Sequence, residues 1–115
     1  MDFSKLAVRL ETVATKGRTI YYSDLVAEFG LPPLDGAWTS HPLSAAFDRL
    51  DREDAEANRP FRTSVVIAKD LNRPGDGFFK SLFELKHVSA KSENQKMEVF
   101  AREFQAASQY PWGET

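Results

Sequence analysis

Apolar side chains recur every three or four residues in five segments of the chain, which is the period of an amphipathic α-helix. In the first segment, Phe3, Leu6, Leu10 and Val13 fall on one face. The same pattern along the rest of the sequence predicts helices over residues 3–16, 24–29, 42–57, 77–87 and 92–109.

Two shorter segments have the composition of β-strands. Residues 18–22 (RTIYY) and 63–69 (TSVVIAK) are rich in β-branched and aromatic side chains. The second segment is apolar on both faces, so we expect both faces to be covered. The segment after the following turn has helical spacing and is predicted to be a helix rather than a wing strand, because its apolar residues are Phe78, Phe79, Leu82, Phe83 and Leu85.

The predicted order is helix, strand, helix, helix, strand, helix, helix. This order predicts an α+β fold: a mostly helical, winged-helix-like domain with a small two- to three-stranded sheet, in which the wing is a loop. Gly17 and Gly30 are expected to end the first two helices, and Pro42 to begin the third. Ser23 and Asp76 are the predicted N-caps of the second and fourth helices.

The composition is that of a soluble globular protein, with 115 residues, 42% of them hydrophobic and 28% charged. A chain of this length predicts one domain, residues 1–115. The sequence has no cysteine, which excludes disulfides, thiolate zinc sites and a cysteine nucleophile. The first ten residues, MDFSKLAVRL, have no long apolar run, so we expect no signal peptide, no membrane partner and a cytoplasmic location.

Charge is distributed unevenly, although the net charge is only −2. Residues 48–56 hold five acids against two arginines, a local charge of −3. Residues 57–91 hold seven cations against three acids, a local charge of +4. A polyanionic partner is therefore expected to meet the second segment.

Two segments resemble a known family. GRTIYYSDLVAEFG (17–30) and PFRTSVVIAKDLNRPGDGFFKSLFELKH (60–87) are similar, in the same order, to parts of the C-terminal domain of O6-alkylguanine-DNA alkyltransferases and alkyltransferase-like proteins. The resemblance covers roughly residues 3–88 and implies a winged-helix-like DNA-binding domain.

This chain departs from that family at the reactive centre. Phe61 stands where the family has its reactive cysteine, and Arg62 and Thr63 replace the following His and Arg. Alkyl transfer needs a thiolate, so that chemistry is excluded, whereas the alkyltransferase-like proteins lack the cysteine and still bind DNA. In the predicted recognition helix, Arg49 is the candidate for the arginine that the family inserts into DNA, and the five acids there are expected to repel phosphates.

Other catalytic patterns are weak. Asp76 followed by Glu84 and Lys86 matches the carboxylate and lysine pattern of metal-dependent nucleases, but residues 84 and 86 of a helix point in different directions. His41 and His87 are isolated and are expected at helix ends or on the surface. With no nucleophile, acid–base pair or metal cluster evident, the sequence predicts a binding domain without catalytic residues, cofactor or metal.

Two binding hypotheses remain open. In the first, a winged-helix-like domain binds nucleic acid through cations on phosphates, with Arg18, Arg49, Arg59, Arg62, Lys69, Arg73 and Lys80 as candidates. In the second, the domain is a protein-interaction module, as a monomer or a dimer, that uses the acidic third helix and the loop residue Trp38. The loop NRPGDGFF (72–79) is either a turn with a positive φ at Gly77 or part of the contact surface.

Overall fold

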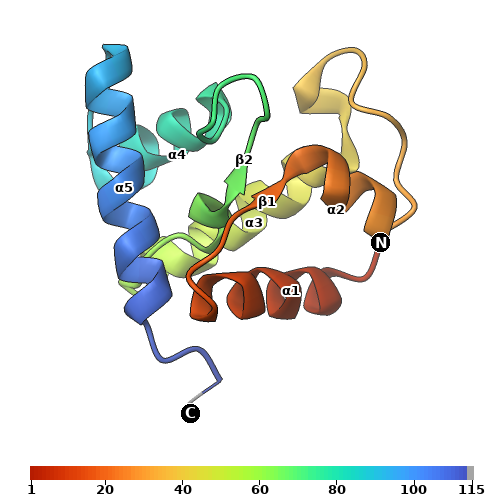
Figure 1. Cartoon of the computed structure of the whole chain (residues 1–115), viewed down its shortest axis with the longest axis horizontal. Helices are drawn as coiled ribbons and strands as arrows, with labels where there is room; N and C mark the ends of the chain where they lie inside the picture. Colours follow the sequence, from red (N-terminus) through yellow and green to blue (C-terminus); the bar gives the residue numbers. More distant parts are fainter. Residues whose placement is uncertain (114–115) are drawn as a thin grey trace.

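The computed structural model describes residues 1–113, and these residues form five α-helices and a two-stranded parallel sheet (Figure 1). The predicted mostly helical α+β class is confirmed. The elements are α1 (Phe3–Thr15), β1 (Ile20–Tyr21), α2 (Tyr22–Glu28), the 3-10 turn η1 (Trp38–Ser40), α3 (Pro42–Glu56), the 3-10 turn η2 (Arg62–Val65), β2 (Val66–Ile67), α4 (Asp76–Lys86) and α5 (Glu93–Gln109).

The five helices lie where their apolar spacing predicts them, because local capping residues agree with that spacing. The Asp2 carboxylate accepts a hydrogen bond from the backbone N–H of Lys5, and Ser92 and Gln95 form a capping box on α5. Two predicted caps are wrong. Helix α2 begins one residue before Ser23, and Asp76 is the first residue of α4 rather than its N-cap.

The second strand is shorter than predicted. Residues 62–65 wind into η2, with the backbone N–H of Ser64 donating to the carbonyl of Phe61, and only Val66 and Ile67 extend beside β1. An antiparallel bridge between Ala68 and Arg73 closes the loop that follows. The left-handed residue of this loop is Asn72, at φ 55°, and not Gly77 as predicted.

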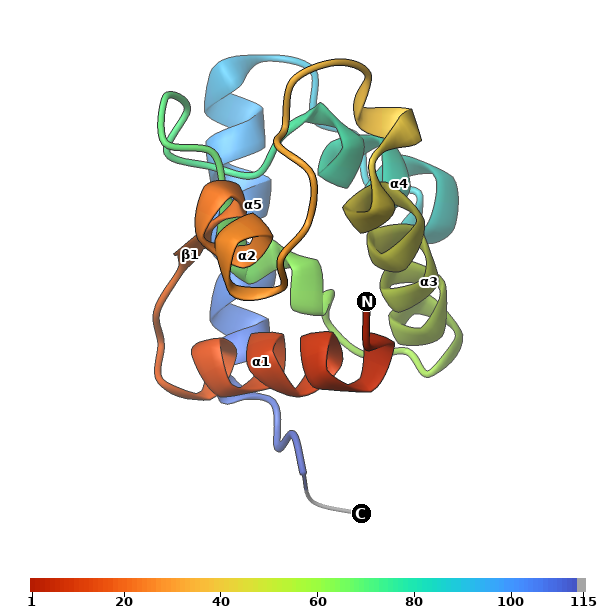
Figure 2. The same ribbon diagram turned by 90° about the vertical axis from the view of Figure 1, so that its right-hand side faces the viewer.

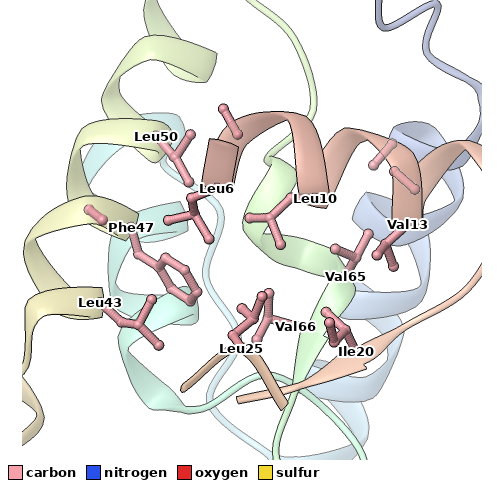
Figure 3. Close-up of a cluster of buried hydrophobic side chains, with 14 residues drawn as sticks. Leu6, Leu10, Val13, Ile20, Leu25, Leu43, Phe47, Leu50, Val65 and Val66 are labelled. Carbon is pink, nitrogen blue, oxygen red and sulfur yellow. The ribbon is translucent and has the colours of Figure 1, made fainter. Parts of the chain in front are cut away.

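The main core is built where α1 and α3 meet the chain around β2. Figure 3 shows side chains from each of these elements pointing toward one another. The buried residues that it labels are Leu6, Leu10, Val13, Ile20, Leu25, Leu43, Phe47, Leu50, Val65 and Val66. Both β2 residues are buried, as the apolar character of that segment predicts.

A second cluster joins α4 to α5. Phe61, Phe78, Phe79, Leu82 and Val99 are buried in it. Phe61, the residue that the sequence resemblance aligns with a reactive cysteine, is a fully buried member of this cluster. Helix α4 also packs against α3, and Figure 2 shows the two helices on the same side of the molecule. The candidate site lies between them.

Candidate functional site

The structure changes the role predicted for Arg62. Its side chain is 4% exposed, and its guanidinium contacts three carboxylates: Glu11 of α1 at 2.9 Å, Glu53 of α3 at 3.2 Å and Asp54 of α3 at 3.0 Å. The Asp54 carboxylate also accepts the backbone N–H of Arg62 at 2.8 Å. This residue is therefore an internal ion-pair partner that holds η2 against α3, and its prediction as a phosphate ligand is corrected.

Arg73 has a similar internal role. Its side chain is 3% exposed and makes a two-pronged contact with Glu93, with N···O distances of 2.6 and 3.0 Å. A third nitrogen donates to the carbonyl of Pro74 at 2.7 Å. These contacts join the loop after β2 to the first turn of α5, so the predicted phosphate contact through Arg73 is corrected as well.

The remaining predicted cations are spread over the surface. Arg59 pairs with Asp54 at 2.6 Å, and Arg49 pairs with Glu53 at 3.3 Å. Among residues 1–113, no carboxylate partner is found for the last three, which are Arg18, Lys69 and Lys80. They lie before β1, after β2 and on α4, so the structure does not bring the seven candidates into one site.

Part of the acidity of α3 is internal. Of its five acids, Asp51 and Asp54 are buried, while Asp48 pairs with Arg52 at 2.9 Å and Glu53 pairs with Arg49. The outer face of α3 thus carries two ion pairs and the exposed Glu56. The expected repulsion of phosphates by five exposed acids is corrected, because two of these acids face inward.

A cleft of about 770 Å³ lies between α3, α4 and the loop 34–41. Aromatic rings form much of its wall. Trp38 meets Tyr22 edge to face at a centroid distance of 5.7 Å, meets Phe47 in the same way at 5.8 Å, and stacks on His41 at 6.0 Å. The predicted partner anchor Trp38 is therefore half-buried and forms part of this wall.

His41 fixes the loop that carries Trp38. Its Nδ1 accepts a hydrogen bond from the backbone N–H of Leu43 at 3.1 Å, so it caps α3. Its Nε2 lies 2.8 Å from the carbonyl of Pro32, which requires that this nitrogen carry the proton. The neutral Nε2–H imidazole thus links the loop to the start of α3, and His41 lies at a helix end as predicted.

The start of α4 forms another wall of the cleft, where Gly77 permits close approach. The backbone N–H of Gly75 donates to the Tyr22 hydroxyl at 2.9 Å. A Cβ atom on Gly77 would stand 3.3 Å from the Trp38 indole nitrogen, so the missing side chain leaves room for the indole. The Gly-rich loop is therefore both a turn and a wall of the cleft.

Asp51 contributes a buried carboxyl group to the cleft. Its side chain is 3% exposed and accepts a hydrogen bond of 2.6 Å from the Thr63 hydroxyl. Burial raises the pKa of Asp51 from 3.8 to about 7, the bond from Thr63 acts in the opposite direction, and the nearby charges of Asp54 and Asp48 raise it further. Near neutral pH this carboxyl group can either donate or accept a hydrogen bond.

The sequence interpretation missed Asp51 and Tyr22 as parts of a site. A signal for Asp51 was present, because it lies four residues after Phe47 on the inward stripe of the third helix. A carboxylate at an apolar position indicates a buried acid that must have a partner. The partner, Thr63, lies twelve residues away, and no local pattern connects the two.

Comparisons with known proteins add no family: no family model, curated protein or solved structure matches this chain. The resemblance to alkyltransferase domains therefore stays a prediction from the residues. Within residues 1–113, no group of three or more histidine or acidic side chains is arranged to hold a metal ion. In the same part of the chain, no helix is both long and apolar enough to cross a bilayer.

Proposed function

We propose that this chain is a nucleic-acid-binding domain that admits an unpaired base into the cleft between α3 and α4. The observation that carries the proposal is the cleft itself, a concave site with aromatic walls and a buried carboxyl group. Base–aromatic stacking is a general means of holding single-stranded nucleic acid. The cleft volume of about 770 Å³ is within the range of small-ligand sites.

The cleft is lined by five acids and one lysine: Asp35, Asp48, Asp51, Asp76, Glu84 and Lys80. Of these, the buried Asp51 suits the hydrogen-bonding edge of a base. Asp51 can accept from an amino or imino N–H when ionised and can donate to a ring nitrogen or carbonyl when protonated. Lys80 lines the cleft, is exposed, and has no carboxylate partner among residues 1–113. It is the member of the predicted cation set that we assign to a phosphate beside the bound base.

A winged-helix-like interpretation is part of the same proposal. The order α1, β1, α2, α3, β2 supports it, with the tight loop 68–73 in the place of the wing. The outer face of α3 is a poor source of phosphate affinity, since Arg49 and Arg52 are already paired and three acids share that face with them. Arg18 precedes β1 and Lys69 follows β2, and both remain available for additional phosphate contacts.

The protein-interaction hypothesis has less support. It depended on an acidic outer face of α3 and on an exposed Trp38, yet two of the α3 acids are buried and the indole packs among three rings. We therefore place nucleic-acid binding first. We propose binding rather than catalysis because the closest partner of the Asp51 carboxyl is a hydroxyl group, not a second acid or base.

The test is binding of single-stranded and duplex oligonucleotides, measured by fluorescence anisotropy at two salt concentrations. Ala45→Trp fills the cleft from α3 and should weaken single-strand binding about tenfold or more, because a stacked base is displaced. Ala101→Trp, at an exposed position of α5, is the matched control and should bind like the native protein. Failure of the native protein to bind either nucleic acid at low salt would overturn the proposal.

The fluorescence of Trp38 tests whether the base enters the cleft. The chain has two tryptophans, so Trp112→Phe leaves Trp38 as the only indole. Titration of this variant with oligonucleotide should quench the Trp38 emission, because the base enters beside the ring. Binding without any change in that emission would place the nucleic acid outside the cleft.

A further inference from the structure

A second concave surface lies on the other side of α4, where this helix meets the start of α5. We name it the α4–α5 patch and define it by its exposed or partly exposed residues Lys80, Phe83, Lys91 and Lys96. These side chains border a shallow hollow of about 320 Å³. No contact described for the core or the cleft accounts for this grouping.

Phe83 is the unusual member of the patch. Its side chain is 59% exposed, whereas the neighbouring Phe79 is 6% exposed and belongs to the core. An exposed phenylalanine leaves a large apolar face in water, and here that face lies among lysines. Its ring is therefore available for stacking on a planar group.

The charge around Phe83 is positive. The hollow is lined by three lysines and one aspartate, a net charge of +2. Lys96 contacts that aspartate, Asp76, at 3.3 Å, while Lys80 and Lys91 have no carboxylate partner within residues 1–113. Glu93, at the start of α5, does not cancel this charge because it is already paired with the buried Arg73.

Lys80 connects the patch to the cleft, because its side chain lines both hollows. Asp76 also borders both. A ligand that extends from the cleft over the first turns of α4 thus passes Lys80 and Asp76 before it reaches Phe83.

We infer that a single-stranded nucleic acid leaving the cleft continues across the α4–α5 patch, with an unpaired base stacked on Phe83 and its phosphates on Lys80 and Lys91. An aromatic face between cations is the arrangement that single-strand binding requires, since every base has a stacking face and every nucleotide a negative charge. A duplex keeps its bases stacked on each other and offers no such face to Phe83. This inference rests on the function proposed above and adds how far the binding surface extends beyond the cleft.

The experiment compares oligothymidylates of 4 and 12 nucleotides by fluorescence anisotropy with the full chain. The native protein should bind the 12-mer more tightly than the 4-mer, because only the longer strand covers both hollows. Phe83→Ala should weaken binding of the 12-mer by about 5- to 100-fold, the usual effect of removing one stacking ring, and leave the 4-mer unchanged. Lys91→Ala should reduce the slope of log K against log salt by about 0.7 for the 12-mer.

Matched controls lie on α1, away from the patch. Val8→Ala removes an exposed apolar side chain and Lys5→Ala an exposed lysine, and both should leave the affinity for the two oligonucleotides unchanged. Thermal unfolding checks that each variant is folded. Phe83 and Lys91 are exposed, so we expect their substitution to leave the fold intact.

The outcomes separate the two proposals. No binding of either oligonucleotide by the native protein would overturn both. Binding that Ala45→Trp abolishes and that Phe83→Ala and Lys91→Ala leave unchanged would overturn only the role of the patch. Binding to vesicles of phosphatidylcholine with one third phosphatidylserine is measured as well. If the native protein binds these vesicles and Phe83→Ala abolishes that binding while leaving 12-mer binding unaffected, the patch is instead a site for an anionic membrane surface.

Discussion

The indole nitrogen of Trp38 faces Gly77 so closely that a Cβ atom at residue 77 would stand 3.3 Å from it. These residues come from the loop before α3 and from the first turn of α4. Their contact closes one end of the cleft. Gly77 does not have a positive φ, so close approach, and not backbone conformation, is the reason for glycine at this position.

Replacing Gly77 with alanine should therefore displace the indole and leave the fold largely intact. Alanine favours a helix over glycine by about 1 kcal/mol, which offsets part of the cost of the new contact. We expect an unfolding free energy within about 1 kcal/mol of the native value and a shifted emission maximum for Trp38, measured in the Trp112→Phe background. Gly75→Ala is the control, because its Cβ would make an ordinary contact of 3.6 Å with Tyr22. Unchanged emission in Gly77→Ala would contradict the proposed contact.

The raised pKa of Asp51 predicts an unusual dependence of stability on pH. Its pKa is 3.8 in the unfolded chain and about 7 in the folded one, so the folded state holds more protons between these values. Its contribution is fully present below the unfolded pKa and is lost as the pH rises through 7. At 1.36 kcal/mol per unit, the difference between native and Asp51→Asn unfolding free energies should change by about 3 kcal/mol from pH 5 to pH 8.

Urea unfolding of both proteins at several pH values measures this difference, and subtraction removes the titration of all groups that the two proteins share. Asp48→Asn is the matched control, since Asp48 is an exposed partner of Arg52. A difference for Asp51→Asn that stays constant from pH 5 to pH 8 would mean that the carboxyl group is ionised throughout. The fold would then have to provide it with a cationic or additional donor partner.

Helix positions could be predicted because their information is local. Each helix has its own apolar stripe, and α5 adds a capping box between Ser92 and Gln95 that is visible in four residues of sequence. The prediction of a strand over 63–69 holds only for Val66 and Ile67. The β-branched composition was correct, but the hydrogen bonds of Arg62 to Asp54, eight residues away, hold residues 62–65 as a 3-10 turn.

Single residues of the cleft could be identified from the sequence, but the cleft that they form together could not. Trp38 and the Gly-rich loop were identified separately, as a partner anchor and as a turn, and nothing in the sequence places them in contact 39 residues apart. The charge of a segment was also misleading. Arg73 counts toward the +4 of residues 57–91, yet its partner Glu93 lies just outside that window and neutralises it in the interior.

The ion pairs of Arg62 predict a large loss of stability on substitution. Arg62→Met keeps much of the side-chain volume and leaves the fully buried Asp54 with Arg59 as its remaining cation. Removing one partner of a buried pair typically costs about 3–5 kcal/mol. Arg52→Met, in an exposed pair with Asp48, should cost at most about 1 kcal/mol. Equal small losses for both variants in urea unfolding would contradict an internal role for Arg62.

The same variant distinguishes structure from binding. A phosphate ligand would lose nucleic-acid affinity on substitution without a change in stability, whereas a buried ion-pair residue loses stability first. In the double variant Asp54→Asn and Arg62→Met, the Asp54 carboxylate that loses Arg62 in the single variant Arg62→Met is also removed. We expect the double variant to be more stable than the sum of the two single losses predicts, because the two charges interact directly.

Two neighbouring buried hydroxyl groups should respond to substitution in opposite directions. The Ser64 hydroxyl is fully buried and has no hydrogen-bond partner within residues 1–113, whereas the Thr63 hydroxyl donates to Asp51 at 2.6 Å. A buried polar group without a partner keeps its full desolvation cost, so Ser64→Ala should raise the unfolding free energy by about 1 kcal/mol. Thr63→Val should lower it by about 1–3 kcal/mol, because Asp51 loses the hydroxyl donor at 2.6 Å. Both values come from urea unfolding at pH 8, where the Asp51 carboxylate is ionised. A loss of stability in Ser64→Ala would show that its hydroxyl has a partner, such as a buried water.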